Sequence, residues 1–205
     1  MRKIGILLTL AIGLPTLQGC IPLIAGGAVA GALVATDRRT SGTILEDESI
    51  EVKVTRAINL KYLDNSHVNV TSFDRTVLLT GEVQNEAIKS DVEKLARVEN
   101  VRNVMNEVVV AGNSSLTSRS SDTLITSKVK GRFMAENQFK ANHVKVVTES
   151  GIVYLMGLVT PAEGAVAAEI ASNTAGVLKV VKAFEYFDEK DQSKISPQPV
   201  PAPTK

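Results

Sequence analysis

Two matching stretches of the chain, residues 76–83 and 152–159, consist mainly of hydrophobic residues. Each stretch is a strand-like apolar run, and Val77, Leu79, Gly81 and Val83 are expected to form the inward face of the first of these strands. Each stretch carries one glycine, and Gly81 and Gly157 lie 76 positions apart. The same shift relates His67 to His143 and the alternating valines that follow them. The chain is therefore predicted to contain two tandem copies of one small unit, in which these glycines belong to the fold.

The order of periodic segments predicts an α-β-β-α-β unit in residues 46–111. Apolar residues recur at helical spacing from Ile50 to Ile58, and acidic residues 46–48 are expected near the start of that helix, where the helix dipole favours anions. Two alternating strands are joined by a turn at 74–75. A second helix ending near residue 100 and a strand from about 103 to 111 complete the unit.

The second copy, residues 122–187, repeats this order. Asp122 is expected to cap its first helix and Pro161 to begin its second, while Gly176 suits the left-handed position that ends the second helix. The expected elements are a helix at 122–135, strands at 143–148 and 152–159, a helix at 161–174 and a strand at 179–187.

These patterns predict an α+β fold of two tandem units, each with a three-stranded mixed sheet covered by two helices. The hairpin is antiparallel, whereas the last strand returns through a helix and therefore pairs in parallel by a right-handed crossover. A unit of about 65 residues buries only a modest core, so contact between the copies is expected to add stability.

Residues 1–19 have the pattern of a secretory signal peptide, with two basic residues before a short apolar run. Cys20 follows directly and is the only cysteine in the chain, so it cannot form an internal disulfide. The segment from Leu17 to Cys20 resembles a bacterial lipobox, which implies that Cys20 carries the lipid anchor. In lipoproteins, a residue other than aspartate after the cysteine, here Ile21, favours the outer membrane and a periplasmic orientation. The alternative is an ordinary signal peptide with an unpaired thiol.

Three further segments lie outside the repeats. Residues 20–45 begin with a glycine- and alanine-rich stretch that is short for a membrane span, and they are predicted to form a tether, with a second insertion device as the alternative. Residues 112–121 are rich in serine and are predicted to be a polar linker. Residues 188–205 are charged and then proline-rich, which is typical of disorder.

The repeated unit, with its glycine in the second strand, resembles the BON family. The motifs that carry the resemblance are Thr76-Val-Leu-Leu-Thr-Gly-Glu-Val83 and Gly151-Ile-Val-Tyr-Leu-Met-Gly-Leu-Val-Thr160, each followed by a predicted helix. The resemblance covers both copies, about 130 residues. It implies an envelope protein that binds phospholipid, is associated with envelope stress and has no enzyme activity.

Charge and motifs exclude several other classes of function. Without the signal peptide the chain has 21 basic and 22 acidic residues, which argues against a nucleic-acid partner. No nucleophile with an adjacent base, and no phosphate-binding loop, stands out. His67 and His143 occupy equivalent positions in the copies, and neither copy adds a second histidine or a cysteine. We therefore expect structural histidines, no metal, no cofactor and no catalytic residue.

The two copies differ on the outer face of the second strand. The second copy presents Tyr154, Met156 and Leu158 there, where the first copy has Leu78, Thr80 and Glu82. An apolar patch of this kind usually marks an interface, so we expect it to pack against the first copy. Self-association is the alternative, and the oligomeric state stays open.

The first helix of the second copy is the expected phospholipid-binding site. Ile125, Val129 and Phe133 form its core stripe, which leaves a far face with apolar residues between basic ones. The expected site residues are Leu124, Ser127, Lys128, Lys130, Gly131, Arg132 and Met134. In the two-unit lipoproteins of the BON family this helix is implicated in lipid binding, although an aromatic residue is expected where Leu124 stands. The alternative is that Leu124 and Met134 cover the linker or the first copy.

Two classes of function remain after these exclusions. The first is a lipid-anchored protein of the outer membrane that binds anionic phospholipid and supports envelope integrity. The copies differ in charge, with eight basic and twelve acidic residues at 46–110 against seven and six at 122–187, so the second copy is the one suited to an anionic surface. The second class is an adaptor that recruits other envelope proteins without binding lipid.

Overall fold

The computed structural model describes residues 37–62, 66–112 and 116–188. The predicted signal peptide, the anchor at Cys20 and most of the tether lie outside the described residues, as does the proline-rich tail from residue 189. The two repeats form two α-β-β-α-β units, as the α+β prediction requires. The first unit consists of α2 (Ser41–Tyr62), β1 (Ser66–Phe73), β2 (Thr76–Val83), α3 (Glu86–Leu95), β3 (Asn103–Asn106) and β4 (Val109–Val110). The second consists of α4 (Leu116–Met134), the 3₁₀ turn η1 (Ala141–His143), β5 (Val144–Glu149), β6 (Ile152–Val159), α5 (Pro161–Ser172) and β7 (Lys179–Tyr186).

Each sheet is mixed, with the second strand of the unit in its centre. β1 pairs with β2, and β5 with β6, in antiparallel hairpins, whereas β7 returns parallel to β6. In the first unit the expected third strand is interrupted, because β3 and β4 both pair in parallel with β2. The Asn106 side chain accounts for the interruption: it donates to the Lys89 carbonyl and accepts from the Val108 N–H. Between β3 and β4, the Glu107 N–H still donates to the Leu79 carbonyl of β2, at 2.9 Å.

The first helix of each unit begins earlier than its apolar periodicity predicts. α2 begins at Ser41, so acidic residues 46–48 lie beyond its first turn, and α4 begins at Leu116 rather than at Asp122. Asp122 is therefore not a helix cap. By contrast, α5 starts at Pro161 as expected, behind a capping box of Thr160 and Glu163. Gly176 has the expected positive φ of 101°, but α5 ends at Ser172, before it.

The carboxylates of Asp47 and Asp122 hold the two hairpin turns against these helices. Asp47 accepts hydrogen bonds from the N–H groups of Asp74 and Arg75, at 2.8 and 2.7 Å. Asp122 accepts from the equivalent N–H groups of Ser150 and Gly151, at 2.9 and 2.8 Å. All four turn residues have positive φ, the conformation of a tight two-residue hairpin turn. Three of them are not glycine, so these bonds stabilise a backbone conformation that is otherwise unfavourable.

The two repeat glycines allow the central strand to approach its hairpin partner closely. A Cβ atom at Gly81 would lie 2.0 Å from the carbonyl oxygen of His67, and Gly81 has a φ of 106°. A Cβ atom at Gly157 would lie 2.5 Å from the carbonyl oxygen of His143. Both contacts are with backbone, which cannot move aside as the end of a side chain does. The same steric constraint therefore explains why both units carry glycine at this position.

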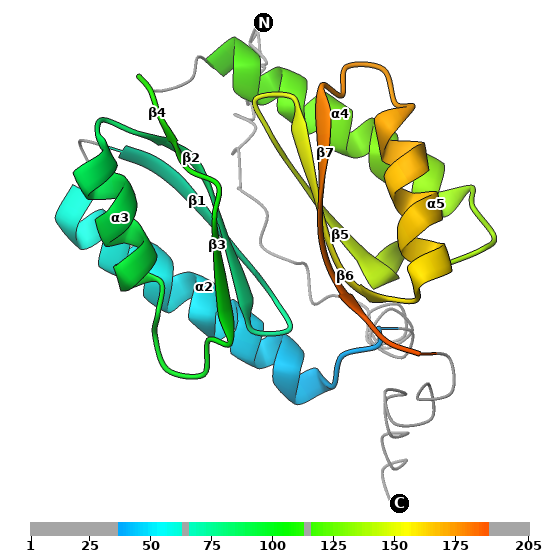
Figure 1. Ribbon diagram of the computed structural model, residues 1–205, viewed down its shortest axis with the longest axis horizontal. Helices are drawn as coiled ribbons and strands as arrows, with labels where there is room; N and C mark the ends of the chain where they lie inside the picture. The colour runs from blue at the N-terminus through cyan, green and yellow to red at the C-terminus, as the bar shows by residue number, and fades with distance from the viewer. Residues whose placement is uncertain (1–36, 63–65, 113–115, 189–205) are drawn as a thin grey trace, which may run out of the picture.

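The two sheets face each other across the centre of the molecule, and the helices lie on the outside (Figure 1). One core lies between the first sheet and α2 and α3, and a second lies between the second sheet and α4 and α5. A third apolar cluster joins the outer sheet faces, with Phe73 and Leu78 of the first unit against Tyr154 and Met156 of the second. The fold is thus four layers, helices, sheet, sheet and helices, and its centre is the contact between repeats.

Two arginines before α2 lie at one end of this contact, where Arg38 connects the units and Arg39 binds within the first unit. Arg38 donates to both carboxylate oxygens of Glu163, at 2.7 and 2.8 Å, and to the Leu158 carbonyl at 2.9 Å. Arg39 pairs with Asp47 at 2.9 Å, and its guanidinium lies over the Phe73 ring. Although burial disfavours the charged form, Arg38 and the Thr160 N–H lower the pKa of Glu163. The chain therefore enters the fold at the junction of the two units.

No helix in the described part of the chain combines the length and the apolar character needed to cross a membrane.

Replacement of Gly81 by alanine should destabilise the protein by about 3 kcal/mol or more, because the new Cβ meets a carbonyl oxygen and the φ is unfavourable. Urea unfolding measures the loss. Gly131→Ala is the matched control, since Gly131 lies in α4 with open space where a Cβ atom would stand. It should instead stabilise the protein, by about 0.5–1 kcal/mol. Equal effects at the two glycines would contradict this account of the central strand.

Candidate functional site

α4 is attached to its unit by the stripe that the sequence predicts. Ile125, Val129 and Phe133 are buried in the second core against the inner face of the sheet. Phe133 also meets the edge of Phe139, with ring centroids 5.1 Å apart. This packing fixes the rotation of the helix and determines which of its residues reach the surface.

The far face of α4 is exposed, and it combines apolar with basic residues. Leu124 and Met134 are 62% and 78% exposed, so neither covers another described part of the chain. Lys128 and Lys130 are exposed beside them, and no ion pair is formed by either lysine among the described residues. Ser127 donates to the Thr123 carbonyl within the helix, and Gly131 leaves open space between the larger side chains.

Arg132 has structural partners that its position in the sequence does not reveal. Its guanidinium donates to the carbonyls of Ile170 and Asn173, at 3.3 and 2.6 Å, and lies 3.1 Å from the Thr174 hydroxyl. These carbonyls are at the end of α5, where a cation is favoured by the helix dipole. Arg132 therefore ties α4 to α5, while its charge still adds to the basic surface of α4.

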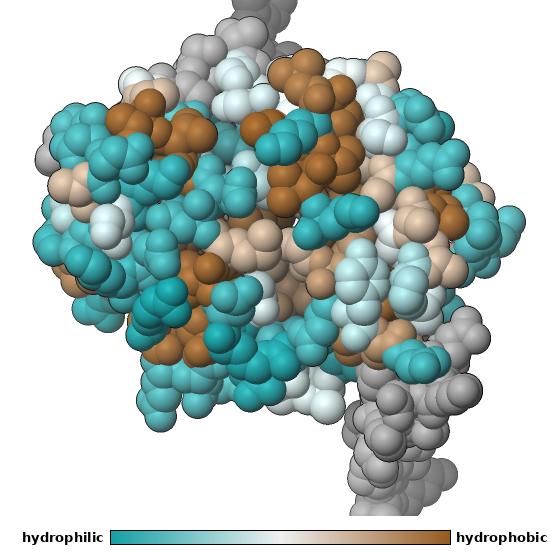
Figure 2. Space-filling model, in the orientation of Figure 1, coloured by the Kyte–Doolittle hydropathy of each residue, from teal (hydrophilic) through white to brown (hydrophobic). Residues whose placement is uncertain are grey.

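Leu178 is a further exposed apolar residue of the second unit, which the sequence analysis did not include. Leu178 is 81% exposed and lies over the hairpin turn at Gly151, whose N–H is bound by Asp122 of α4. In Figure 2 a group of apolar atoms covers the sheet end where β7 begins. Leu178 follows α5 in a loop without periodicity. Only the folded chain therefore brings it beside the hairpin turn that Asp122 of α4 binds.

The matching helix of the first unit also has exposed apolar residues. Leu45, Val52 and Leu60 are exposed on α2, and the last two line a surface groove of about 630 Å³. The charges separate the two helices. α2 has three basic and four acidic residues, whereas α4 has four basic residues and one acid, the buried Asp122.

The outer sheet face of the second unit lies in the contact between units. Tyr154 and Met156 are buried against Phe73 and Leu78, and Leu158 packs at the edge of the same cluster. Burial, and then the charges of Glu107 and Glu149, raise the pKa of Tyr154 to about 12. A rim of polar pairs surrounds the cluster, formed by Lys145 with Glu51, Arg102 with Glu185 and Asn69 with Glu149.

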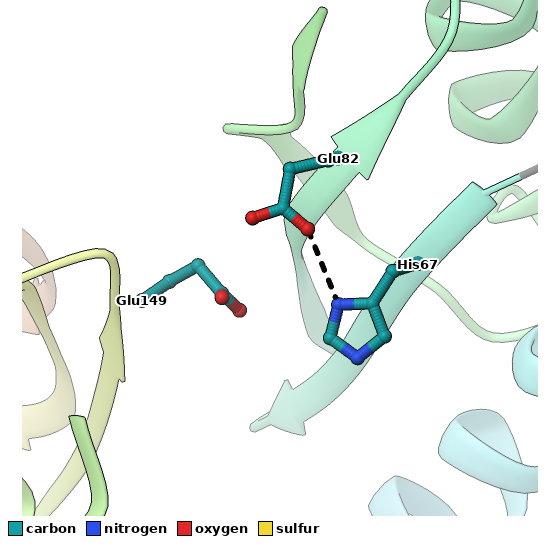
Figure 3. Close-up of side chains that lie close together, drawn as sticks. All are labelled: His67, Glu82 and Glu149. Carbon is teal, nitrogen blue, oxygen red and sulfur yellow. Dashed lines mark ion pairs between the residues drawn. The ribbon is translucent and has the colours of Figure 1, made fainter. Parts of the chain in front are cut away.

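His67 lies at one corner of this contact, beside two carboxylates (Figure 3). Glu82 is its partner across the β1–β2 hairpin, and Glu149 reaches it from the end of β5 in the other unit. His143 instead lies 3.9 Å from Glu163. Neither copy contains this set of side chains by itself, because Glu149 comes from the other copy, 82 residues after His67. The sequence pattern of one repeat therefore does not indicate the cluster.

The fold and the surface together point to one class of protein, in which two tandem α-β-β-α-β units pack through their sheets and the second unit presents an exposed basic and apolar helix. The sequence profile of the BON domain matches residues 46–112 and 121–186. The chain therefore belongs to the BON domain family.

Three relatives resemble the chain over most of its length. The outer membrane lipoprotein DolP of Haemophilus influenzae is 40% identical over 191 residues, which cover 92% of this chain and 97% of the relative. The 21 kDa hemolysin of Actinobacillus pleuropneumoniae is 34% identical, covering 73% and 79%. The osmotically-inducible protein Y of Escherichia coli is 31% identical, covering 74% and 78%.

The Tyr154 hydroxyl should ionise with a midpoint near pH 12, against about 10 in the unfolded chain. The pKa is raised on folding, so the associated stability is fully present below pH 10 and is lost as the pH rises towards 12. Absorbance at about 295 nm follows tyrosine ionisation, and the difference between wild type and Tyr154→Phe isolates this residue from Tyr62 and Tyr186. A midpoint near 10 while circular dichroism still reports a folded chain would contradict burial of Tyr154 between the units.

Proposed function

We propose that this protein is an outer-membrane lipoprotein, anchored through Cys20 and facing the periplasm, whose second BON unit binds anionic phospholipid and supports envelope integrity. The observation that carries the proposal is the exposed face of α4, where Leu124 and Met134 stand between Lys128 and Lys130. The similarity to an outer membrane lipoprotein over nearly the whole of both chains supports the location.

Electrostatics favour α4 over α2 as the surface that meets lipid. Each lysine near an anionic bilayer contributes about 1 kcal/mol of attraction. α4 combines four basic residues with one buried acid, whereas the acids of α2 cancel its basic residues. An anionic surface therefore attracts the second unit and gains little from the first.

The apolar side chains then supply contact with the boundary between headgroups and acyl chains. Leu124, Met134 and Leu178 are exposed to water in the free protein, so their burial in the interface stabilises the bound state. Leucine lacks the preference of tryptophan for the headgroup region, which predicts shallow, reversible contact. The anchor at Cys20 supplies the permanent attachment, and α4 orients the units against the bilayer.

The groove on α2 favours the second candidate function, an adaptor for another envelope protein. Val52 and Leu60 line it together with Glu51, Arg56 and Asn59. Mixed charge around apolar residues is typical of protein interfaces rather than of lipid-binding surfaces. The two functions use different helices and are therefore separable by mutation.

Reversal of charge at both Lys128 and Lys130 to glutamate should weaken binding to anionic vesicles by at least about 30-fold, because roughly 2 kcal/mol of attraction is lost and repulsion is added. Flotation of the unlipidated chain with vesicles containing phosphatidylglycerol measures binding. The matched control reverses Lys53 and Arg56, which are exposed on α2, and should change binding little. Equal loss in both variants would assign binding to overall charge, and unchanged binding in the α4 variant would remove α4 from the site.

Replacement of Leu124 by tryptophan should strengthen vesicle binding and report its position. The chain contains no tryptophan, so the new residue is a unique fluorophore. Its emission should shift to shorter wavelength when anionic vesicles are added, because the indole enters the headgroup region. Vesicle binding without any shift would place the lipid contact away from α4.

The anchor has its own test. Cells supplied with a fatty-acid analogue should label the wild-type protein and leave Cys20→Ser unlabelled, since no other cysteine is present. An unlabelled mature wild-type protein would contradict lipidation at Cys20 without bearing on α4.

A further inference from the structure

The contact between the two units contains a group of side chains with the composition of a metal site. His67 projects from β1, Glu82 from the paired position on β2, and Glu149 from the end of β5 in the other unit. Figure 3 shows the three side chains pointing towards one another. One ligand atom from each lies within 4.8 Å of the others.

Both carboxylates are buried, and the one ion pair that either forms among the described residues is that of Glu82 with His67. Glu82 is 3% exposed and Glu149 8% exposed, and neither forms an ion pair with an arginine or lysine among the described residues. Glu149 accepts only from neutral groups there, the Asn69 amide at 2.7 Å and the Thr80 hydroxyl at 3.3 Å. Two buried carboxylates at such close range are strongly unfavourable unless a cation accompanies them.

Two atoms of the cluster also lack hydrogen-bond partners. His67 Nδ1 and Glu82 Oε2 are buried without a hydrogen bond in the described structure. They lie 3.4 Å apart. Two ligands of one tetrahedral Zn²⁺ ion are separated by about 3.3–3.6 Å, given metal–ligand bonds of about 2.0–2.2 Å. The pair is therefore already spaced as ligands of a single ion, and a carboxylate oxygen of Glu149 lies within 4.8 Å of a ligand atom on each of the two residues.

We propose that His67, Glu82 and Glu149 bind a divalent transition-metal ion of the zinc type between the two BON units. One imidazole and two carboxylates are ligands suited to such an ion, whereas Ca²⁺ takes six or more oxygen ligands. His67 and Glu149 also line a cavity of about 490 Å³ below α4, which gives the ion a path from solvent and leaves a coordination position for water. Asn69 and Thr80 orient Glu149 as supporting residues.

The second histidine of the repeat provides an internal comparison. Under the shift of 76 residues, the positions of Glu82 and Glu149 correspond to Leu158 and Phe73, neither of which binds metal. His143 lies near Glu163 instead, and Arg38 already binds that carboxylate. The chain therefore assembles a complete ligand set at only one of its two equivalent histidines.

A metal at this position joins the units, because its ligands come from both. Binding to the folded chain alone stabilises it by mass action, so the melting temperature of the metal-free protein should rise when Zn²⁺ is added. Of the residues proposed to bind lipid, Ser127 and Lys130 also line the cavity beside the cluster, whereas Lys128 and Leu124 lie outside it.

The test is calorimetric titration of Zn²⁺ into the full-length chain, purified in mild detergent without a histidine tag and freed of metal. Wild type should bind one equivalent and show an increased melting temperature. His67→Gln and Glu149→Gln should each weaken binding by at least about 10-fold, and His143→Gln should leave it unchanged. Ca²⁺ at the same concentration should not compete.

A fourth variant guards against loss of folding. Asn69→Ala removes the amide that orients Glu149 and leaves all three ligands, so it should lower affinity by about 10-fold with an unaltered circular dichroism spectrum. Absence of binding by wild type would overturn the proposal. Binding that survives Glu149→Gln, or that is lost equally in His143→Gln, would also overturn it, because the ion would then be held elsewhere.

Discussion

The apolar contact between the two sheets is the constraint on which the rest of this structure depends. A three-stranded sheet has two faces, and the helices of each unit cover only one of them. In the second unit the other face presents Tyr154 and Met156, which are too apolar to remain in water. Phe73 and Leu78 of the first unit cover them. The repeats therefore pack back to back, and the first helix of each unit is left on the outside (Figure 1).

In both units, the first helix, the hairpin turn and the central strand are held together by the same contacts. In each unit a carboxylate of the first helix binds the hairpin turn, through Asp47 in one and Asp122 in the other. The central strand then passes so close to its partner that glycine is required opposite the carbonyl of each repeat histidine. Helix, turn and strand are thus fixed together, and the outer face of the sheet is presented as a rigid surface.

The two copies differ in the surfaces that their first helices present. The α4 surface is basic with exposed apolar residues, which suits an anionic lipid surface, whereas the α2 groove has mixed charge and suits a protein. The interface itself is also asymmetric. One corner holds His67 with two carboxylates, and at the other Arg38 joins Glu163 and the Leu158 carbonyl. Arg38, near the start of the described residues, therefore connects the two units at this corner.

The sequence by itself determined the repeat, the element order and the inward face of α4, because these follow from local periodicity and from glycine at two equivalent positions. Ile125, Val129 and Phe133 form a buried stripe at helical spacing, and the opposite residues must then face outward. The hydrogen-bond partners of Asp122, Arg132 and Glu149, by contrast, are seen only in the tertiary structure. Their partners lie 28 or more residues away along the chain, in the hairpin turn, at the end of α5 and in the first unit. Periodicity reports which side of an element is buried, but it carries no information about which distant polar group will stand opposite.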